Sequence, residues 1–190
     1  PGGDRSLGTQ MKATGEVMAI DRTFEAALQK AVRSMENGRG SLLWENPEWG
    51  GEGPPDLLAD DDRLWKLTAA IRGGRTAESV SLETGVDPWF PRAIARIIGM
   101  ERRLLGEELT PDLMRRSKRM GFSDAQIGTL GDYLPEQVRT MRKDWGLKPV
   151  YKMVDTCAGE FEAVTPYFYS TYEQENEAIA TGRETAIVLG

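Results

Sequence analysis

The sequence predicts a mainly α-helical protein whose short helices are flanked by pieces of α/β domains. Three observations support this fold class. Between residues 60 and 146 one pattern recurs: a capping residue, one to four helical turns, then a glycine. Residues 1–40 and 147–190 instead contain strand-forming runs. Residues 185–189 have the composition of a buried parallel strand, which needs sheet neighbours that the chain scarcely supplies. We therefore expect a helical unit, residues 41–146, between two incomplete neighbours cut from a longer chain.

The first neighbour, residues 1–40, is expected to contain one strand and one helix. Residues 14–20 form an apolar run typical of a short strand, with Glu16 inside it. Asp21 or Thr23 can then cap a helix that starts near Phe24. Its apolar side chains share one face, which predicts packing against another element, and they are Phe24, Leu28, Ala31, Val32 and Met35. Gly38 and Gly40 are expected to end it.

A solvated linker and a domain boundary are expected after this helix. Residues 43–55 are rich in glycine and proline, which disfavour regular elements. Seven carboxylates occur between residues 41 and 62 without any basic residue. Because carboxylates repel one another and are strongly hydrated, this composition favours an exposed segment.

The helical unit follows, and its helices are predicted from their ends. The expected starts are Asp61, Thr76, Asp87 with Pro88, Thr110 with Pro111, and the capping box Ser123 with Gln126. The expected stops are Gly73, Gly74, Gly85, Gly106, Gly121, Gly131 and Gly146. The longest helix runs from Asp87 to about Gly106. Beyond Lys148, strand-forming residues return at 150–154 and 167–172.

Composition excludes several kinds of chemistry. The chain has one cysteine, Cys157, and no histidine, which removes internal disulfides, thiolate or imidazole zinc sites and histidine-based catalytic triads. Asp155, Glu160 and Glu162 surround Cys157 and could share proton work, but solvated or capping roles are the simpler interpretation. Cys157 itself is expected to be a small buried residue. We predict no catalytic, cofactor-binding or metal-binding residue in this segment.

Charge leaves one alternative function open. The net charge of −6 argues against general nucleic-acid or membrane-surface binding, and no apolar run reaches the about 20 residues that span a bilayer. Residues 92–119 nevertheless carry eight basic residues among short helices, as a helix-turn-helix module does. Against this, Arg96 has Glu101 nearby and Arg103 precedes Glu107, as on an ordinary solvated face. The aromatic residues Trp65, Trp89, Phe90 and Phe122 are expected in the core.

Longer motifs resemble the large chain of carbamoyl phosphate synthetase over nearly the whole sequence. Residues 7–35, which contain Thr-Gly-Glu-Val-Met-Ala-Ile, are similar to the end of the first ATP-grasp unit of that family. Residues 84–90, Thr-Gly-Val-Asp-Pro-Trp-Phe, and 118–124, Lys-Arg-Met-Gly-Phe-Ser-Asp, resemble its helical oligomerisation domain. Residues 148–173 resemble the entry into its second synthetase unit. The resemblance thus implies ATP-grasp or pre-ATP-grasp fragments at 1–40 and 147–190, with the oligomerisation domain at 41–146.

The resemblance implies a role for this segment as connector and oligomerisation element, without activity of its own. The parent would make carbamoyl phosphate from bicarbonate, glutamine-derived ammonia and two ATP, in the cytoplasm, for arginine or pyrimidine synthesis. It would use ATP, magnesium or manganese, and potassium, bound outside this segment. Implied partners are the rest of the large chain, a glutaminase small subunit and further copies, with no nucleic acid and no membrane. An independent small enzyme is a third interpretation, disfavoured by the missing phosphate loop and histidine.

One residue role follows from the resemblance alone. Glu16, in Gly-Glu-Val-Met, matches an acidic position expected to line the internal tunnel of the family. Asp21 departs from the pattern, which usually has glycine there, and residues 44–55 depart as well.

Overall fold

The computed structural model describes residues 3–12, 15–50, 55–161 and 167–179, together with residues 182, 184 and 186. In this described part, seven α-helices, one 3-10 helix and one two-stranded sheet follow in order. They are α1 (Phe24–Ser34), η1 (Pro47–Gly50), α2 (Arg63–Arg72), α3 (Ala77–Thr84), α4 (Trp89–Gly106), α5 (Pro111–Arg119), α6 (Asp124–Gly131), α7 (Pro135–Asp144), β1 (Val150–Val154) and β2 (Tyr167–Thr171). The prediction of a mainly helical protein is confirmed.

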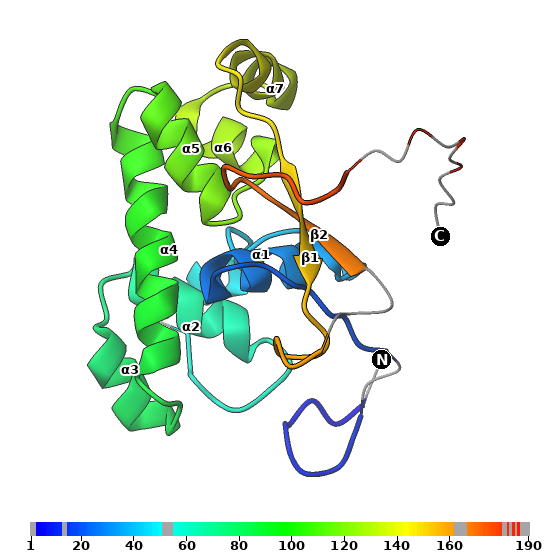
Figure 1. Cartoon of the computed structure of the whole chain (residues 1–190). Helices are drawn as coiled ribbons and strands as arrows, with labels where there is room; N and C mark the ends of the chain where they lie inside the picture. Colours follow the sequence, from blue (N-terminus) through cyan, green and yellow to red (C-terminus); the bar gives the residue numbers. More distant parts are fainter. Residues whose placement is uncertain are drawn as a thin grey trace.

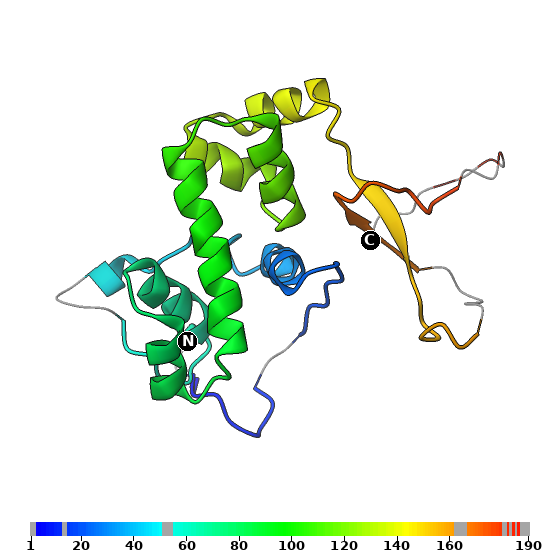
Figure 2. The same ribbon diagram turned by 60° about the vertical axis from the view of Figure 1, so that its left-hand side comes forward.

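Helix α4 is the long element around which the others gather (Figure 1). Helices α2 and α3 lie beside its first half, and α5, α6 and α7 lie near its end. The antiparallel hairpin of β1 and β2, with Val150 opposite Thr171 and Val154 opposite Tyr167, stands apart from α4. Both views place α1 between α4 and this hairpin (Figures 1 and 2). None of the helices in the described ranges has the length and hydropathy needed to cross a bilayer.

The predicted helix ends are largely confirmed, because capping is a local interaction. The hydroxyls of Thr23, Thr76, Thr110 and Ser123 each accept a hydrogen bond from a first-turn backbone N–H. Gln126 completes the capping box by accepting from the backbone N–H of Ser123 at 2.9 Å. Helix α3 ends at Gly85, whose φ of +70° belongs to the left-handed region that favours glycine.

Two apolar clusters make up the core, and α4 contributes to both. Ile97, Met100 and Leu104 pack with side chains of α5, α6 and α7 such as Leu113 and Val138. Ile94 and Ile98 face α2 and α3 instead, where they meet Leu67, Ile71 and Val80. Residues three or four apart share a helical face, so two neighbouring stripes on α4 serve two sets of helices.

The prediction of a solvated linker over residues 43–55 is wrong for residues 43–50, which include the 3-10 helix η1. Leu42 is 1% exposed and belongs to the same cluster as Val32 of α1 and Trp65 of α2. Trp44 and Trp49 pack against this cluster and against each other, with ring centroids 5.4 Å apart. Burying two indole rings outweighs the tendency of glycine, proline and acids to stay solvated. The core therefore extends across the expected boundary at residue 41; the three domain ranges stay a prediction.

The strand predicted over residues 14–20 is wrong for residues 15–20, which have no regular secondary structure. A strand needs a hydrogen-bonding neighbour along its edge. Here the backbone carbonyl of Ile20 accepts from Lys30 Nζ at 3.0 Å instead. The strand predicted at 185–189 falls mostly outside the described residues. Pieces of ATP-grasp domains at either end stay a prediction.

Candidate functional site

The helical unit holds both of its flanking segments, and each contact is a candidate functional site. We call the contact of residues 169–173 with α1, α5, α6 and α7 the C-terminal junction. The contact of residues 3–12 with residues 56–62 is the N-terminal junction. Both are built mainly from charged side chains with defined partners.

At the C-terminal junction, Asp21 and Lys30 tie the hairpin to α1. The Asp21 side chain is 5% exposed, and its Oδ2 lies 2.6 Å from Lys30 Nζ. Its Oδ1 accepts a hydrogen bond from the Thr171 hydroxyl at 3.1 Å. Lys30 Nζ also donates to the carbonyls of Ile20 and Ser170. One ammonium and one carboxylate therefore connect segments that lie 150 residues apart.

A second group of charges at the C-terminal junction surrounds Tyr172. Asp124 receives hydrogen bonds from Lys118 Nζ at 2.8 Å and from Arg142 Nη2 at 2.9 Å. The Tyr172 ring lies over both cations, with its centroid 5.0 Å from Lys118 Nζ and 5.8 Å from Arg142 Cζ. Next to it, Arg119 pairs with Glu173 at 2.8 Å.

Burial and charge shift the pKa values in this group in opposite directions. Burial lowers the pKa of Lys118, and its bond to Asp124 recovers only part of that loss. Burial by itself raises the pKa of Asp124, but the hydrogen bonds from Arg142 and Lys118 outweigh it and leave that pKa below its ordinary value. Burial raises the pKa of Tyr172. Burial therefore disfavours the charged forms of these groups, and the bonds around Asp124 favour them.

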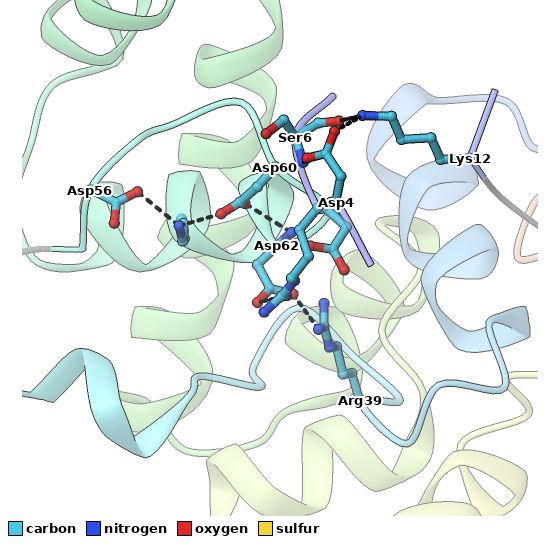
Figure 3. A network of polar contacts seen from close by, with 10 residues as sticks. Asp4, Ser6, Lys12, Arg39, Asp56, Asp60 and Asp62 are labelled. Atoms are coloured by element: carbon cyan, nitrogen blue, oxygen red, sulfur yellow. Dashed lines mark hydrogen bonds and ion pairs between the residues drawn. The ribbon is translucent and has the colours of Figure 1, made fainter. Parts of the chain in front are cut away.

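The N-terminal junction is a network of aspartates and cations (Figure 3). Arg5 Nε donates to Asp61 at 2.7 Å, and its Nη2 donates to Asp62 at 2.5 Å. Arg39 pairs with Asp62 from the other side. The Arg39 guanidinium lies between two indole rings, 4.5 Å from the Trp44 centroid and 4.4 Å from that of Trp65. This stacking links the junction to the core.

Three further acids of residues 41–62 also have partners, namely Glu45, Asp56 and Asp60. Lys66 Nζ contacts Asp56 at 2.8 Å and Asp60 at 2.6 Å, and Glu45 pairs with Arg72. The negative charge of this stretch, which has no basic residue of its own, is thus offset by cations from elsewhere in the chain. They are Arg5, Arg39, Lys66 and Arg72. In the described ranges, no three or more acidic, histidine or cysteine side chains are grouped so that they could hold a metal ion. Because these carboxylates are engaged by cations, the chemistry of the set fits structural linkage.

Of the two neighbouring charge pairs noted in the sequence, one differs in the structure. Arg96 pairs with Glu25 of α1 at 2.5 Å, whereas Glu101 is 3% exposed and binds Arg72 at 2.8 Å. The expectation that Glu101 lies beside Arg96 on a solvated face is therefore wrong, while Arg103 does pair with Glu107, at 2.7 Å. Closeness in the sequence suggested that Arg96 and Glu101 are neighbours, but each of them pairs with a different helix, α1 and α2 respectively.

The aromatic predictions are half confirmed. Trp65 and Phe122 are buried, at 2% and 1% exposed. Trp89 and Phe90 are 50% and 43% exposed, which contradicts their expected place in the core. They occupy the first turn of α4, whereas the buried face of the helix starts at Pro91.

The acids around Cys157 and the predicted tunnel residue are not brought together. Cys157 is half-buried, not fully buried as expected, and its backbone N–H donates to Asp155 Oδ1 at 2.9 Å. Glu160 is exposed, and Glu162 lies outside the described residues. Glu16 is exposed in the irregular segment before α1. The sequence patterns did not predict the contacts that residues 169–173 make with the helices. The one sequence feature that pointed to them was Asp21, where the family pattern usually has glycine.

We expect Asp21→Gly to loosen the hairpin without unfolding the helices. The substitution removes the carboxylate that holds Lys30 and the Thr171 hydroxyl, so local opening becomes easier. Hydrogen exchange of the β2 amides should accelerate roughly tenfold or more, while the amides of α4 keep their protection. Asp4→Gly, which removes an exposed pair with Lys12 and a local hydrogen bond from the Ser6 backbone N–H, is the matched control. Unchanged exchange in β2 would contradict the role given to Asp21.

Comparison with known proteins shows similarity to one enzyme family. A family model described as the oligomerisation domain of the carbamoyl-phosphate synthetase large chain matches residues 16–146. The carbamoyl phosphate synthase large chain of Thermomicrobium roseum is 52% identical over 193 residues, covering 99% of this chain. The large chain of the same name from Caldanaerobacter subterraneus is 44% identical over 192 residues, covering 98%. This chain spans 18% of the length of each of these relatives.

Proposed function

Since this chain belongs to the family of carbamoyl phosphate synthetase large chains and contains its oligomerisation domain, we propose that it joins the two halves of a longer ligase and mediates self-association. The observation that carries the connecting role is the pair of junctions. Residues before α1 and residues after α7 are both bound by the helical unit, and they meet each other at Asp21, Lys30 and Thr171.

The parent enzyme is proposed to make carbamoyl phosphate from bicarbonate, glutamine-derived ammonia and two ATP. Support comes from the names of relatives that are similar over nearly all of this chain. Residues 1–40 would end the first ATP-grasp unit and residues 147–190 would begin the second. A glutaminase small subunit, the cytoplasm, and arginine or pyrimidine synthesis belong to the same proposal. Magnesium or manganese, potassium and ATP would be held elsewhere in the parent, since Asp56, Asp60 and Asp62 are each paired with a cation.

The basic residues of 92–119 support this proposal over nucleic-acid binding. Arg92, Arg96, Arg103, Arg116, Lys118 and Arg119 each pair with a carboxylate of the chain. Paired cations have less charge available for phosphates. The comparisons give no support to a helix-turn-helix module.

Sedimentation of the chain at increasing concentration tests self-association. We expect the weight-average mass to rise reversibly with concentration, and no ATP hydrolysis at any concentration. Phe168→Lys, which places a charge on the exposed hairpin strand, separates association through that edge from association through the helices. Its mass should rise like that of the wild type. A chain that stays monomeric throughout would refute self-association.

We also propose that Glu16 lines the passage between the two catalytic units of the parent. Its exposure in this chain leaves its carboxylate available to a neighbouring domain. In the full-length enzyme, Glu16→Gln should uncouple ATP consumption from product formation, whereas Glu36→Gln, at another exposed acid, should not. Equal coupling in both variants would remove this role.

A further inference from the structure

An aromatic cluster at the start of α4 is left partly uncovered. The rings of Phe24, Trp89 and Phe90, which we call the aromatic patch, meet edge to face with centroids 5.0 to 5.5 Å apart. Trp89 is 50% and Phe90 is 43% exposed. Half-exposed tryptophan and phenylalanine side by side are uncommon on a surface that only faces water, and such residues are enriched where proteins bind one another.

Charges of both signs border the aromatic patch. Arg92 follows Trp89 by three residues and so lies on the same face of α4. It pairs with Glu78 of α3 at 3.0 Å, and both side chains are more than half exposed. Arg96, one turn further along, is 53% exposed and pairs with Glu25. A partner of a single charge sign, such as nucleic acid, would meet as many repulsive as attractive groups here.

From this arrangement we propose that the aromatic patch is the central contact through which two copies of this chain associate. The proposal rests on the self-association proposed above and names its surface. A two-fold axis through the patch brings the same rings together from both copies and sets the Arg92 side chain of one opposite the Glu78 side chain of the other. Charged groups at the rim of one copy would therefore face groups of opposite sign on the other copy.

The area of the aromatic patch determines how strong the self-association is expected to be. Aromatic side chains bury about 150–250 Å² each, so the exposed halves of Trp89 and Phe90 supply about 200 Å² per copy. A stable interface takes about 800 Å² from each partner. The patch is thus the centre of an interface, with the rim supplying the remainder, and association should be weak and reversible in this chain.

Alanine at Trp89 tests the surface. Trp89→Ala should raise the dissociation constant for self-association about tenfold to a hundredfold in sedimentation experiments. The matched control is Leu105→Ala, since Leu105 is 64% exposed on the same helix but lies about 24 Å further along it. Circular dichroism verifies that both variants keep the wild-type helix content.

A cross-linking experiment locates the axis without touching the rings. In a Cys157→Ser background, Arg92→Cys should give a covalent dimer with a short bis-maleimide, and Leu105→Cys should not. If the wild type associates but Trp89→Ala is unaffected and the Arg92→Cys variant does not cross-link, the surface is wrong while self-association stands. A wild type that stays monomeric overturns both.

Discussion

Replacing Gly121 by alanine is expected to destabilise the chain by about 3 kcal/mol or more. Gly121 has a φ of +92°, a conformation that alanine adopts only with strain. A Cβ at this position would lie 2.7 Å from the Cα of Ala26 and 3.0 Å from its carbonyl oxygen. Both contacts are with backbone of α1, so no side-chain rotation relieves them. Urea unfolding followed by circular dichroism measures the loss.

Gly99→Ala provides a control of opposite sign. Gly99 lies inside α4, and a Cβ there meets no heavy atom within 4 Å. Alanine favours a helix over glycine by about 1 kcal/mol, so this variant should be more stable than the wild type. Similar effects of the two substitutions would mean that the close approach of Gly121 to α1 is not what makes glycine necessary.

The second large effect is expected for Asp124→Ala, which should cost about 3 kcal/mol. The Lys118 and Arg142 side chains are only 7% and 11% exposed, and both depend on this carboxylate. Removing it leaves two neighbouring cations without their shared anion beneath Tyr172. The chain should also lose the near-ultraviolet signal of a fixed Tyr172 ring. Asp112→Ala, which breaks only an exposed pair with Arg116, should change stability by less than about 1 kcal/mol.

The same carboxylate gives stability a pH dependence. The folded-state pKa of Asp124 is lowered, so its contribution is fully present above the pKa of the unfolded carboxyl, near 4, and disappears as pH falls through the folded value. Unfolding free energy measured from neutral pH into acid should fall less steeply for Asp124→Asn than for the wild type. Parallel curves would contradict the assignment.

Sequence patterns predicted the elements best where the cause is local. Thr76, Thr110 and Ser123 cap helices because each hydroxyl reaches backbone three residues away. The two runs at 150–154 and 167–171 became β1 and β2 since strand-forming residues could pair across one hairpin. The run at 15–20 has similar composition but no strand beside it, so the same prediction is wrong there.

Candidate sites were harder to predict because their contacts are long-range. Asp21 was predicted only as a helix cap or as a departure from a family pattern, yet its carboxylate accepts a hydrogen bond from Thr171. The acids of 41–62 suggested a solvated linker, although their cations come from residues 5, 39, 66 and 72. Nothing in the local pattern separates Trp65 and Phe122, which are buried, from Trp89 and Phe90, which are not.

The sequence by itself determined the helical class, most helix ends and the family resemblance, because capping, periodicity and motif identity are all written within a few consecutive residues. Only the tertiary structure decided which charges pair, where the aromatic patch is left open and how the flanking segments meet. Arg96 pairs with Glu25 across 71 residues, and Gln29 with Gln126 across 97. Such partners are set by how α1 packs against the other helices, since packing fixes which side chains become neighbours once apolar faces are buried.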